Sequence, residues 1–249
     1  MDRSRDVLSR RAVIAGGLAA GAGLVAPLRA LAQEVSLPSP GLTLAGPGGL
    51  SQGAQAGFVP TPPVAPGTVA ANPAAVAAYQ RRVLDVAARQ VERVRGQLWR
   101  TDLVGIADFA LPSWRPRFHF ANLENGTVRS FLLAHGRGSD PGHSGWLQNF
   151  SNQVGSEATS RGAYLTCEWY KGKYGTSIKL VGMDPDNSAA LNRAIVMHPA
   201  WYVDAAMISK YGKLGRSEGC FAMGDADFNE ALWHLSGGRL LFADRIGEA

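Results

Sequence analysis

One stretch near the carboxyl end carries the most information in this chain: Lys213-Leu214-Gly215-Arg216-Ser217-Glu218-Gly219-Cys220-Phe221. It puts a cysteine behind a Ser-x-Gly turn, 22 residues after His198. The thiolate is the reactive form of cysteine, so a nucleophilic cysteine needs a neighbour that removes its proton, and a histidine does this. Gly219 permits backbone angles that let N–H groups turn toward a developing oxyanion. We predict Cys220 as a nucleophile, His198 as its base, and Ser217 and Gly219 as the residues that shape the turn.

Short apolar runs surround this stretch and predict a mainly β chain beyond residue 100. The candidate strands are 103–111, 117–123, 127–134, 178–182, 194–198, 221–223 and 239–243. Asn125-Gly126 between the second and third runs predicts a hairpin. The range 135–161 is rich in Gly, Ser, Asn and Asp and predicts a long loop, and such loops in compact domains tend to be functional. Asp225 is expected to cap a helix through His234.

One amphipathic helix is expected before these strands, in 73–100. Asn72-Pro73 supplies a capping residue and a proline at the first helical position. Apolar residues then recur at steps of three or four: Val76, Tyr79, Val83, Ala87, Val91, Val94 and Leu98. The opposite face is rich in arginine. We expect the apolar face to pack on the protein's own core, and a helix lying on an anionic membrane is the alternative.

The amino-terminal segment 1–32 has the features of an export signal. Ser9-Arg10-Arg11 precedes an uncharged run rich in Ala and Gly, which is typical of the twin-arginine route of bacteria. Ala30-Leu31-Ala32 fits a signal-peptidase site, so we expect cleavage after Ala32 and a periplasmic or otherwise exported protein without a stable membrane anchor. An uncleaved anchor is the alternative, although the apolar run is short for a membrane span.

The range 33–72 is rich in Pro, Gly and Ala and is predicted to be a flexible arm, because it offers little apolar surface to bury. Cleavage after Ala32 takes five Arg and two acidic residues from totals of 25 and 20, which leaves a net charge of +2. Basic residues are scattered apart from the helix, so we expect no nucleic-acid partner. The range 101–249 remains as the expected catalytic domain.

With these residues in view, the chain resembles the murein L,D-transpeptidases of the YkuD catalytic type, in their exported bacterial branch. The match is carried by His198, by Ser217-Glu218-Gly219-Cys220 and by His135-Gly136-Arg137-Gly138-Ser139. The resemblance covers about residues 100 to 245 and implies a compact β-sandwich-like fold. Three positions differ from the family's pattern. Pro199 follows the histidine where the family has Gly, and Glu218 stands between Ser and Gly where the family has His. Phe221-Ala222 follows the cysteine where the family has a nearby Arg. Arg137 or Arg216 is therefore the predicted substitute that holds a substrate carboxylate.

The resemblance implies acyl transfer through a Cys220 thioester, without a cofactor or a metal. The acyl donor would be a peptidoglycan stem tetrapeptide that releases D-Ala, and an amine acceptor would give a 3-3 cross-link. Water as the acceptor would make the site an L,D-carboxypeptidase instead. We also place His135 and Trp201 among the substrate-binding residues, and His135 could replace His198 as the base.

Other interpretations stay open at this stage. Cys167 and Cys220 could form a disulfide that staples a non-catalytic wall-binding domain. His135, Asp140 and His143 offer zinc-ligand side chains. A sortase-like enzyme also orders His before Cys and needs a later Arg, for which Arg239 is available. Oligomeric state is not indicated by the sequence.

Overall fold

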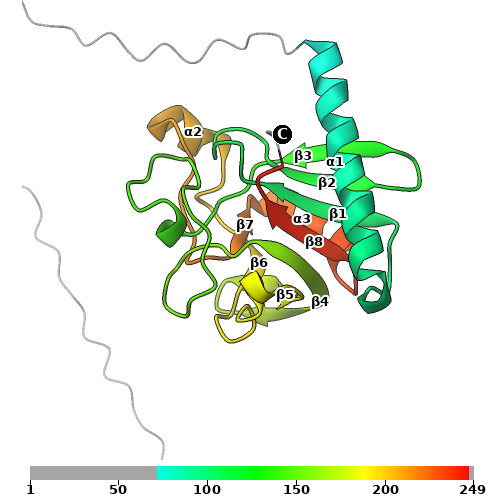
Figure 1. Cartoon of the computed structure of the whole chain (residues 1–249). Coiled ribbons are helices and arrows are strands. Elements are labelled where there is room, and N and C mark those ends of the chain that lie inside the picture. Colours follow the sequence, from blue (N-terminus) through cyan, green and yellow to red (C-terminus); the bar gives the residue numbers. More distant parts are fainter. Residues whose placement is uncertain (1–71, 247–249) are drawn as a thin grey trace, which may run out of the picture. The chain divides into compact units, whose positions relative to one another are not determined.

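The computed structural model describes residues 72–246, and Figure 1 shows a mainly β architecture with a long helix at its amino-terminal end. Eight strands in this range form one sheet in the order β3-β2-β1-β8-β4-β5-β6-β7. The strands are β1 Leu103–Asp108, β2 Phe118–Asn122, β3 Thr127–Phe131, β4 Gly162–Gly172, β5 Gly175–Gly182, β6 Val196–Pro199, β7 Phe221–Met223 and β8 Leu240–Asp244. The α-helices are α1 Pro73–Val94, α2 Ala205–Tyr211 and α3 Asp225–Leu235. The expectation of a mainly β fold with a preceding helix and few short helices is confirmed.

The two ends of the sheet come together around one core. Ala134, three residues beyond β3, donates its N–H to the carbonyl of Ala222 in β7 at 2.9 Å. Phe131 of β3 and Phe221 of β7 belong to the same cluster of buried apolar side chains. The sheet therefore curls until its first and last strands share a core, which gives the sandwich-like character.

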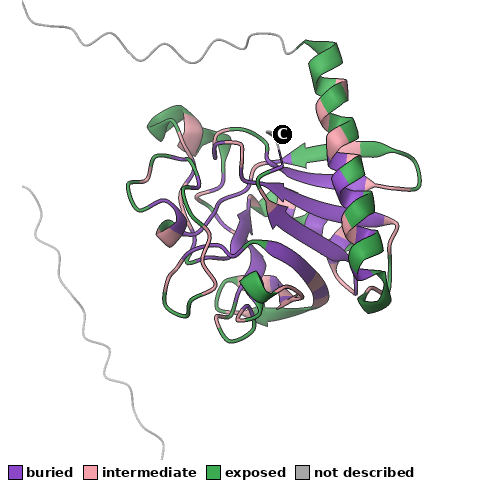
Figure 2. Cartoon of the chain, viewed as in Figure 1, coloured by how far each residue is buried: buried purple, intermediate pink, exposed green. Residues whose placement is uncertain are grey.

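Helices cover both faces of the half of the sheet that contains β1 and β8. Alternate residues of a strand point to opposite faces. Val104 and Phe242 pack with the apolar face of α1, whereas Leu103 and Leu241 lie in the cluster that includes α3. Figure 2 shows α1 buried along its inner face and exposed along its outer face. Asn72 caps α1 by accepting a hydrogen bond from the Ala74 N–H at 3.0 Å.

Several sequence-based expectations differ from the structure at this level. Val76 is 41% exposed, because it lies in the first turn of α1 before the helix reaches the sheet. The residue that caps α3 is Gly224, and Asp225 is the first helical residue, where its charge favours the helix dipole. The eleven-residue strand β4 was not predicted, because a register shift between Thr166 and Trp169 interrupts the alternation of side chains. The short helix α2 was also missed, although Asp204 caps it and Gly212 ends it with a φ of 72°.

The predicted signal peptide 1–32 and most of the arm 33–72 lie outside the described residues, so cleavage after Ala32 and export remain predictions. Within residues 72–246, no helix combines the length and the apolar character that crossing a membrane requires.

Candidate active site

A pair of parallel strands brings His198 and Cys220 to the same place. In the β6–β7 ladder, His198 lies opposite Ala222 and Met197 lies opposite Phe221. Cys220 directly precedes β7 and therefore lies beside Val196, two residues before the histidine. Cys220 is 5% exposed and His198 is 3% exposed, and both line one cavity of about 210 Å³. A thiol and an imidazole thus share a small cavity at the edge of the sheet.

The surroundings of His198 favour its neutral form and one tautomer. Its Nδ1–H donates to the carbonyl oxygen of Pro199 at 2.8 Å, which leaves Nε2 as the unprotonated nitrogen. The ring of Tyr174 stacks on the imidazole with centroids 4.5 Å apart and an angle of 18° between the planes. Burial lowers the pKa of His198 below its ordinary value, against the opposing effect of the bond to Pro199. His198 is therefore suited to accept a proton near neutral pH.

Ser217 closes the turn before the cysteine. Its hydroxyl donates to the carbonyl of Cys220 at 2.6 Å and accepts the N–H of Gly219 at 3.2 Å. Gly219 has a φ of 111°, and a Cβ atom there would lie 2.8 Å from the carbonyl oxygen of Ala158. The turn needs glycine at this position both for its backbone angles and for the space. Since the Gly219 N–H already binds Ser217, the Cys220 N–H is the better candidate for an oxyanion donor.

Cys220 is held as a neutral thiol in the resting structure. Burial raises the pKa of the Cys220 thiol most, and the carboxylate of Glu218 raises it further, while the Val196 N–H and the Arg193 guanidinium lower it. The S–H group donates to the carbonyl oxygen of Ala194 at 3.7 Å. A raised thiol pKa beside a lowered imidazole pKa means that the pair rests as two uncharged groups rather than as an ion pair.

A second cavity, of about 470 Å³, also reaches Cys220. Four residues line both cavities: Lys173, Tyr174, Glu218 and Cys220. Lys173 and Tyr174 form the two-residue connection of the β4–β5 hairpin, where Gly172 pairs with Gly175. Sequence reasoning missed this hairpin tip because it missed β4. The signal available in the sequence was Gly175, which follows the two connecting residues Lys173 and Tyr174. Gly175 has a φ of 81°, which suits a tight hairpin.

Arg193 was missed as well. Its guanidinium donates to the carbonyl of Ser151 at 2.6 Å, to the hydroxyl of Ser160 at 2.5 Å and to the carbonyl of Ala158. It thereby ties the long loop to the segment that leads into β6, next to Cys220 in the larger cavity. Its sequence position, just before the apolar run that ends in His198, gave no pattern from which this contact could be predicted.

The four residues predicted to bind substrate separate into two pairs. Arg137 and Arg216 line the smaller cavity. Arg137 forms an ion pair with Glu157, and Arg216 donates to the carbonyls of Asp140 and Pro141. Trp201 is 76% exposed and lines neither cavity, whereas its neighbour Tyr202 lines the smaller one.

His135 lies behind the site rather than in it. It is 1% exposed, its Nδ1 lies 2.7 Å from an amino nitrogen of Arg117, and its Nε2 lies 3.5 Å from a carboxylate oxygen of Asp140. Burial, with help from the Arg117 charge, lowers the pKa of His135 to about 3. Its carbonyl accepts the N–H of Ser217 at 2.9 Å, so His135 supports the turn from its buried side. This position speaks against direct contact with a substrate and against a role as the base.

The alternatives from the sequence find no support in this geometry. Cys167 and Cys220 are both free thiols. The Nε2 of His143 donates to the carbonyl of Leu214 at 2.9 Å, so His143 does not join Asp140 in a metal site. No group of three His, Cys, Asp or Glu side chains within residues 72–246 could hold a metal ion. Arg239, the candidate for a sortase-like arginine, instead pairs with Asp102 at 2.7 Å.

The fold and the site define a mainly β domain with a thiol and a neutral imidazole in one cavity. The family model of the L,D-transpeptidase catalytic domain matches residues 76–243, which is more than half of the chain. The protein belongs to this family of enzymes.

The solved structures that resemble the chain do so at low sequence identity. An L,D-transpeptidase from Mycobacterium smegmatis is 12% identical, with 57% of this chain and 58% of that chain covered and a TM-score of 0.35. An L,D-transpeptidase from Mycobacterium tuberculosis is 12% identical, with 57% of each chain covered and a TM-score of 0.37. The helical cell shape determining protein Pgp2 from Campylobacter jejuni is 11% identical, with 57% of this chain and 47% of that chain covered and a TM-score of 0.36. The chain thus spans less than two thirds of each of these structures, and the family membership rests on the family model alone. No curated protein matches the chain in sequence.

Proposed function

We propose that the protein is a peptidoglycan L,D-transpeptidase that works through a Cys220 thioester. Cys220 Sγ attacks the carbonyl between the third and fourth residues of a stem tetrapeptide, and the C–N bond breaks to release D-Ala. An amine of a second stem peptide then attacks the thioester carbonyl and forms a 3-3 cross-link, which frees the thiol. The observation that carries this proposal is the cavity that Cys220 shares with His198, whose Nε2 is unprotonated.

His198 moves the proton in each half of the reaction. In the first half it takes the thiol proton as sulfur attacks and gives it to the nitrogen of the departing D-Ala. In the second half it takes a proton from the attacking amine and gives it to the departing Cys220 sulfur. Since thiol and imidazole rest uncharged, the proton moves only when an acyl donor is present to accept the sulfur. The oxyanion of the tetrahedral intermediate is stabilised by backbone donors of the turn, with the Cys220 N–H as the first candidate.

The two cavities that meet at Cys220 favour an amine acceptor over water. Cross-linking needs two peptides at one sulfur, one as acyl donor and one as acceptor. Cavities of about 210 Å³ and 470 Å³ both reach Cys220, and both are lined by Glu218 and Tyr174, whose carboxylate and hydroxyl oxygens are 3.4 Å apart. A carboxypeptidase needs room for only one peptide at the sulfur, so the second cavity supports transpeptidation.

Lys173 is the best candidate to hold a substrate carboxylate. Arg137 is engaged by Glu157 and Arg216 by two backbone carbonyls. No described carboxylate pairs with the Lys173 ammonium, whose nitrogen lies 5.1 Å from the centre of the Tyr174 ring. It stands on a hairpin tip that lines both cavities, so it can meet a carboxylate on either peptide.

The experiment that tests the proposal uses residues 33–249 and a disaccharide-tetrapeptide, with products and intact protein followed by mass spectrometry. The wild-type protein should give 3-3 dimers, free D-Ala and a covalent acyl adduct on Cys220. Cys220→Ala should abolish all three, and Cys167→Ala, the matched control cysteine, should leave them unchanged. His198→Gln should lower the rate by roughly 100-fold or more, the usual contribution of a general base.

Each contrary outcome has a defined meaning. Tripeptide without dimers would replace the transpeptidase by a carboxypeptidase. Activity that survives in Cys220→Ala would end the thioester mechanism. A protein that forms neither product nor adduct would contradict the proposed function.

A further inference from the structure

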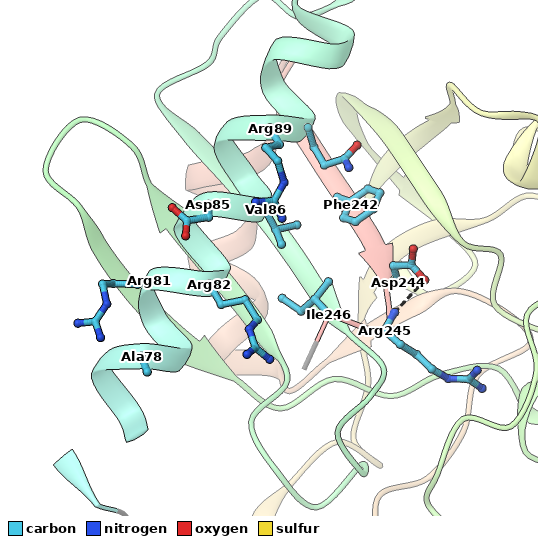
Figure 3. A pocket seen from close by; sticks show the side chains of 11 residues that line it. Ala78, Arg81, Arg82, Asp85, Val86, Arg89, Phe242, Asp244, Arg245 and Ile246 are labelled. Carbon is cyan, nitrogen blue, oxygen red and sulfur yellow. Dashed lines mark hydrogen bonds between the residues drawn. The ribbon is translucent and has the colours of Figure 1, made fainter. Parts of the chain in front are cut away.

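Two of the cavities outside the active site border α1. Figure 3 shows the larger one, of about 610 Å³, where Arg81 and Asp85 lie on the outer side of the helix, so the charged side chains do not converge on one ligand. The smaller one, of about 380 Å³, lies beside the first turns of α1 and reaches β2 and β3. We call it the Ser130 cavity. Eight residues line it: Ala75, Val76, Tyr79, Leu111, Arg115, Pro116, His119 and Ser130.

A chain of hydrogen bonds runs from the Ser130 cavity into the protein. Ser130 Oγ lies 2.8 Å from His119 Nδ1, and His119 Nε2 lies 2.9 Å from Tyr79 Oη. The Tyr79 hydroxyl in turn donates to Asp108 Oδ2 at 2.6 Å. His119 and Ser130 are directly opposite each other in the β2–β3 ladder, which places both side chains on the same face of the sheet. The chain therefore joins side chains from β3, β2, α1 and β1.

The direction of each proton follows from Asp108. Its Oδ1 accepts two backbone N–H groups, at 2.9 Å and 3.0 Å, so with Tyr79 it takes three donors, as an ionised carboxylate does. Tyr79 has one hydroxyl proton, which it gives to Asp108, so its oxygen can only accept the N–H at Nε2 of His119. In a neutral imidazole the other nitrogen, Nδ1, is then unprotonated. The Ser130 hydroxyl is therefore the donor to His119 Nδ1.

His119 is a neutral and firmly held base. It is 1% exposed, and burial lowers its pKa to about 4 against the opposing effect of the Asp108 charge, so it is uncharged near neutral pH. The edge of the Tyr79 ring packs against it, with ring centroids 5.4 Å apart. A hydroxyl bonded to a base whose other nitrogen is fixed by a third group is the arrangement that activates a serine. If Ser130 loses its proton, Asp108 stabilises the imidazolium through the Tyr79 hydroxyl.

The Ser130 hydroxyl is the accessible end of this chain. Ser130 is exposed on the edge strand β3, whereas Asp108 and His119 are buried. Because the hydroxyl proton points to His119, the lone pairs of Ser130 Oγ are left for an electrophile. Val76, Leu111 and Pro116 give the cavity apolar walls, which suit an apolar acyl group.

Arg115 supplies a positive charge in the same cavity. Within residues 72–246, no carboxylate pairs with its guanidinium. Burial raises the pKa of Tyr79 most, and the charge of Arg115 opposes this, so that charge acts at the hydroxyl in the middle of the chain. A guanidinium near the nucleophile can stabilise the oxyanion that forms when Ser130 attacks a carbonyl. The lining as a whole fits a small carboxylic ester.

We propose that Ser130 is a second nucleophile of this protein, which hydrolyses small carboxylic esters independently of Cys220. Ser130 Oγ attacks the ester carbonyl, and His119 Nδ1 takes the hydroxyl proton. The ester C–O bond breaks, and the proton passes from His119 to the oxygen of the departing alcohol. Water then attacks the acyl-serine and gives a proton to His119, which returns it to Ser130 Oγ as the carboxylic acid leaves.

The first test labels the full chain with a fluorophosphonate, which an activated serine attacks at phosphorus with loss of fluoride. The chain carries Cys220→Ala, so the active-site thiol does not contribute, and the labelled residue is located by peptide mass spectrometry. Ser130 should carry the adduct, and Ser130→Ala should carry none. Ser209 is an exposed serine of α2 and serves as the matched control. It should stay unlabelled, and Ser209→Ala should leave the labelling of Ser130 unchanged.

The second test measures turnover and the role of the hydrogen-bond chain. Hydrolysis of p-nitrophenyl butyrate by the Cys220→Ala protein, above the buffer rate, should fall roughly 100-fold or more in Ser130→Ala. Tyr79→Phe keeps the ring and removes the hydroxyl that fixes the His119 tautomer. Labelling of Ser130 should then slow about 10-fold or more, in a protein that still unfolds cooperatively in a denaturant titration.

The contrary results are equally defined. A folded protein without a Ser130 adduct, or with equal labelling of Ser130 and Ser209, would overturn the proposal, and the chain of bonds would then serve only to anchor α1. Ester hydrolysis that is lost in Cys220→Ala and unchanged in Ser130→Ala would do the same. If Tyr79→Phe does not fold, the contrast between Ser130→Ala and Ser209→Ala still decides.

Discussion

Cys220 titrates under the influence of two neighbouring charges of opposite sign. Burial raises its pKa most, Glu218 raises it further, and Arg193 lowers it. Glu218 is exposed, so it can be changed without disturbing the core. In Glu218→Gln we expect the pKa of Cys220 to fall, because the carboxylate no longer opposes the thiolate. The rate of alkylation of Cys220 by iodoacetamide should therefore rise at any pH below the thiol pKa.

The measurement is peptide mass spectrometry of Cys220 alkylation as a function of pH. Glu230→Gln removes an exposed carboxylate from α3 and serves as the matched control, with an unchanged profile. A profile for Glu218→Gln that moves to higher pH would contradict the position assigned to this carboxylate.

Gly136 is a second residue whose identity follows from its surroundings. A Cβ atom there would overlap the carbonyl oxygen of Glu157 and would lie 2.7 Å from the backbone nitrogen of Gly219. Both contacts are backbone atoms, which cannot rotate away. Gly136→Ala should lower the free energy of unfolding by about 3 kcal/mol or more and slow the Cys220 reaction. Gly96→Ala, with no atom within 4 Å of its Cβ, should be neutral or slightly stabilising in the same denaturant titration. Equal stabilities of the two variants would contradict the crowding at Gly136.

At the scale of elements, the tip of the β4–β5 hairpin controls the environment of His198. The Tyr174 ring covers the imidazole, and burial is what lowers the pKa of His198. In Tyr174→Leu the imidazole should gain water and its pKa should rise toward its ordinary value. Since the base must be neutral, the acidic limb of the pH–rate profile should move to higher pH.

Tyr174→Phe is the matched control, because it keeps the stacked ring and removes only the hydroxyl. Its acidic limb should coincide with that of the wild type, and NMR titration of the His198 ring protons should show the same contrast. If Tyr174→Leu and Tyr174→Phe give acidic limbs at the same pH, the hairpin does not set the pKa of His198.

These elements also show how far the sequence could lead. The sequence was sufficient to predict Cys220 and His198 as partners. The signals were the Ser-x-Gly-Cys turn and the short apolar runs at 194–198 and 221–223, because each of the two side chains lies in or next to a short strand. Tyr174 and Lys173 could not be predicted, because the bulge in β4 hides the strand that carries them toward the site. The burial of His135 could not be predicted from the sequence either, because its partners Arg117 and Asp140 come from separate segments that only the folded sheet brings together.

At the scale of the whole molecule, α1 is part of the fold rather than an appendage. Val104, Ile106, Leu240 and Phe242 face it from the sheet. Burial of each such side chain contributes roughly 1.5 to 3 kcal/mol, so exposing all four would cost about 6 to 12 kcal/mol. Domains of this kind have a net stability of only about 5 to 15 kcal/mol. The part of the chain without α1 should therefore not hold its native structure.

Three chains test this in one denaturant titration: 33–249, 72–249 and 95–249. The first two should unfold at the same midpoint and turn over the disaccharide-tetrapeptide at the same rate, because the Pro/Gly/Ala-rich sequence before residue 72 offers little apolar surface to bury. The third should lose the cooperative transition and the activity together. Loss of activity in 72–249 would instead give the arm a role at the active site, and a stable, active 95–249 would mean that the sheet tolerates an uncovered face. The three outcomes differ in which segment of the chain the Cys220 turn depends on.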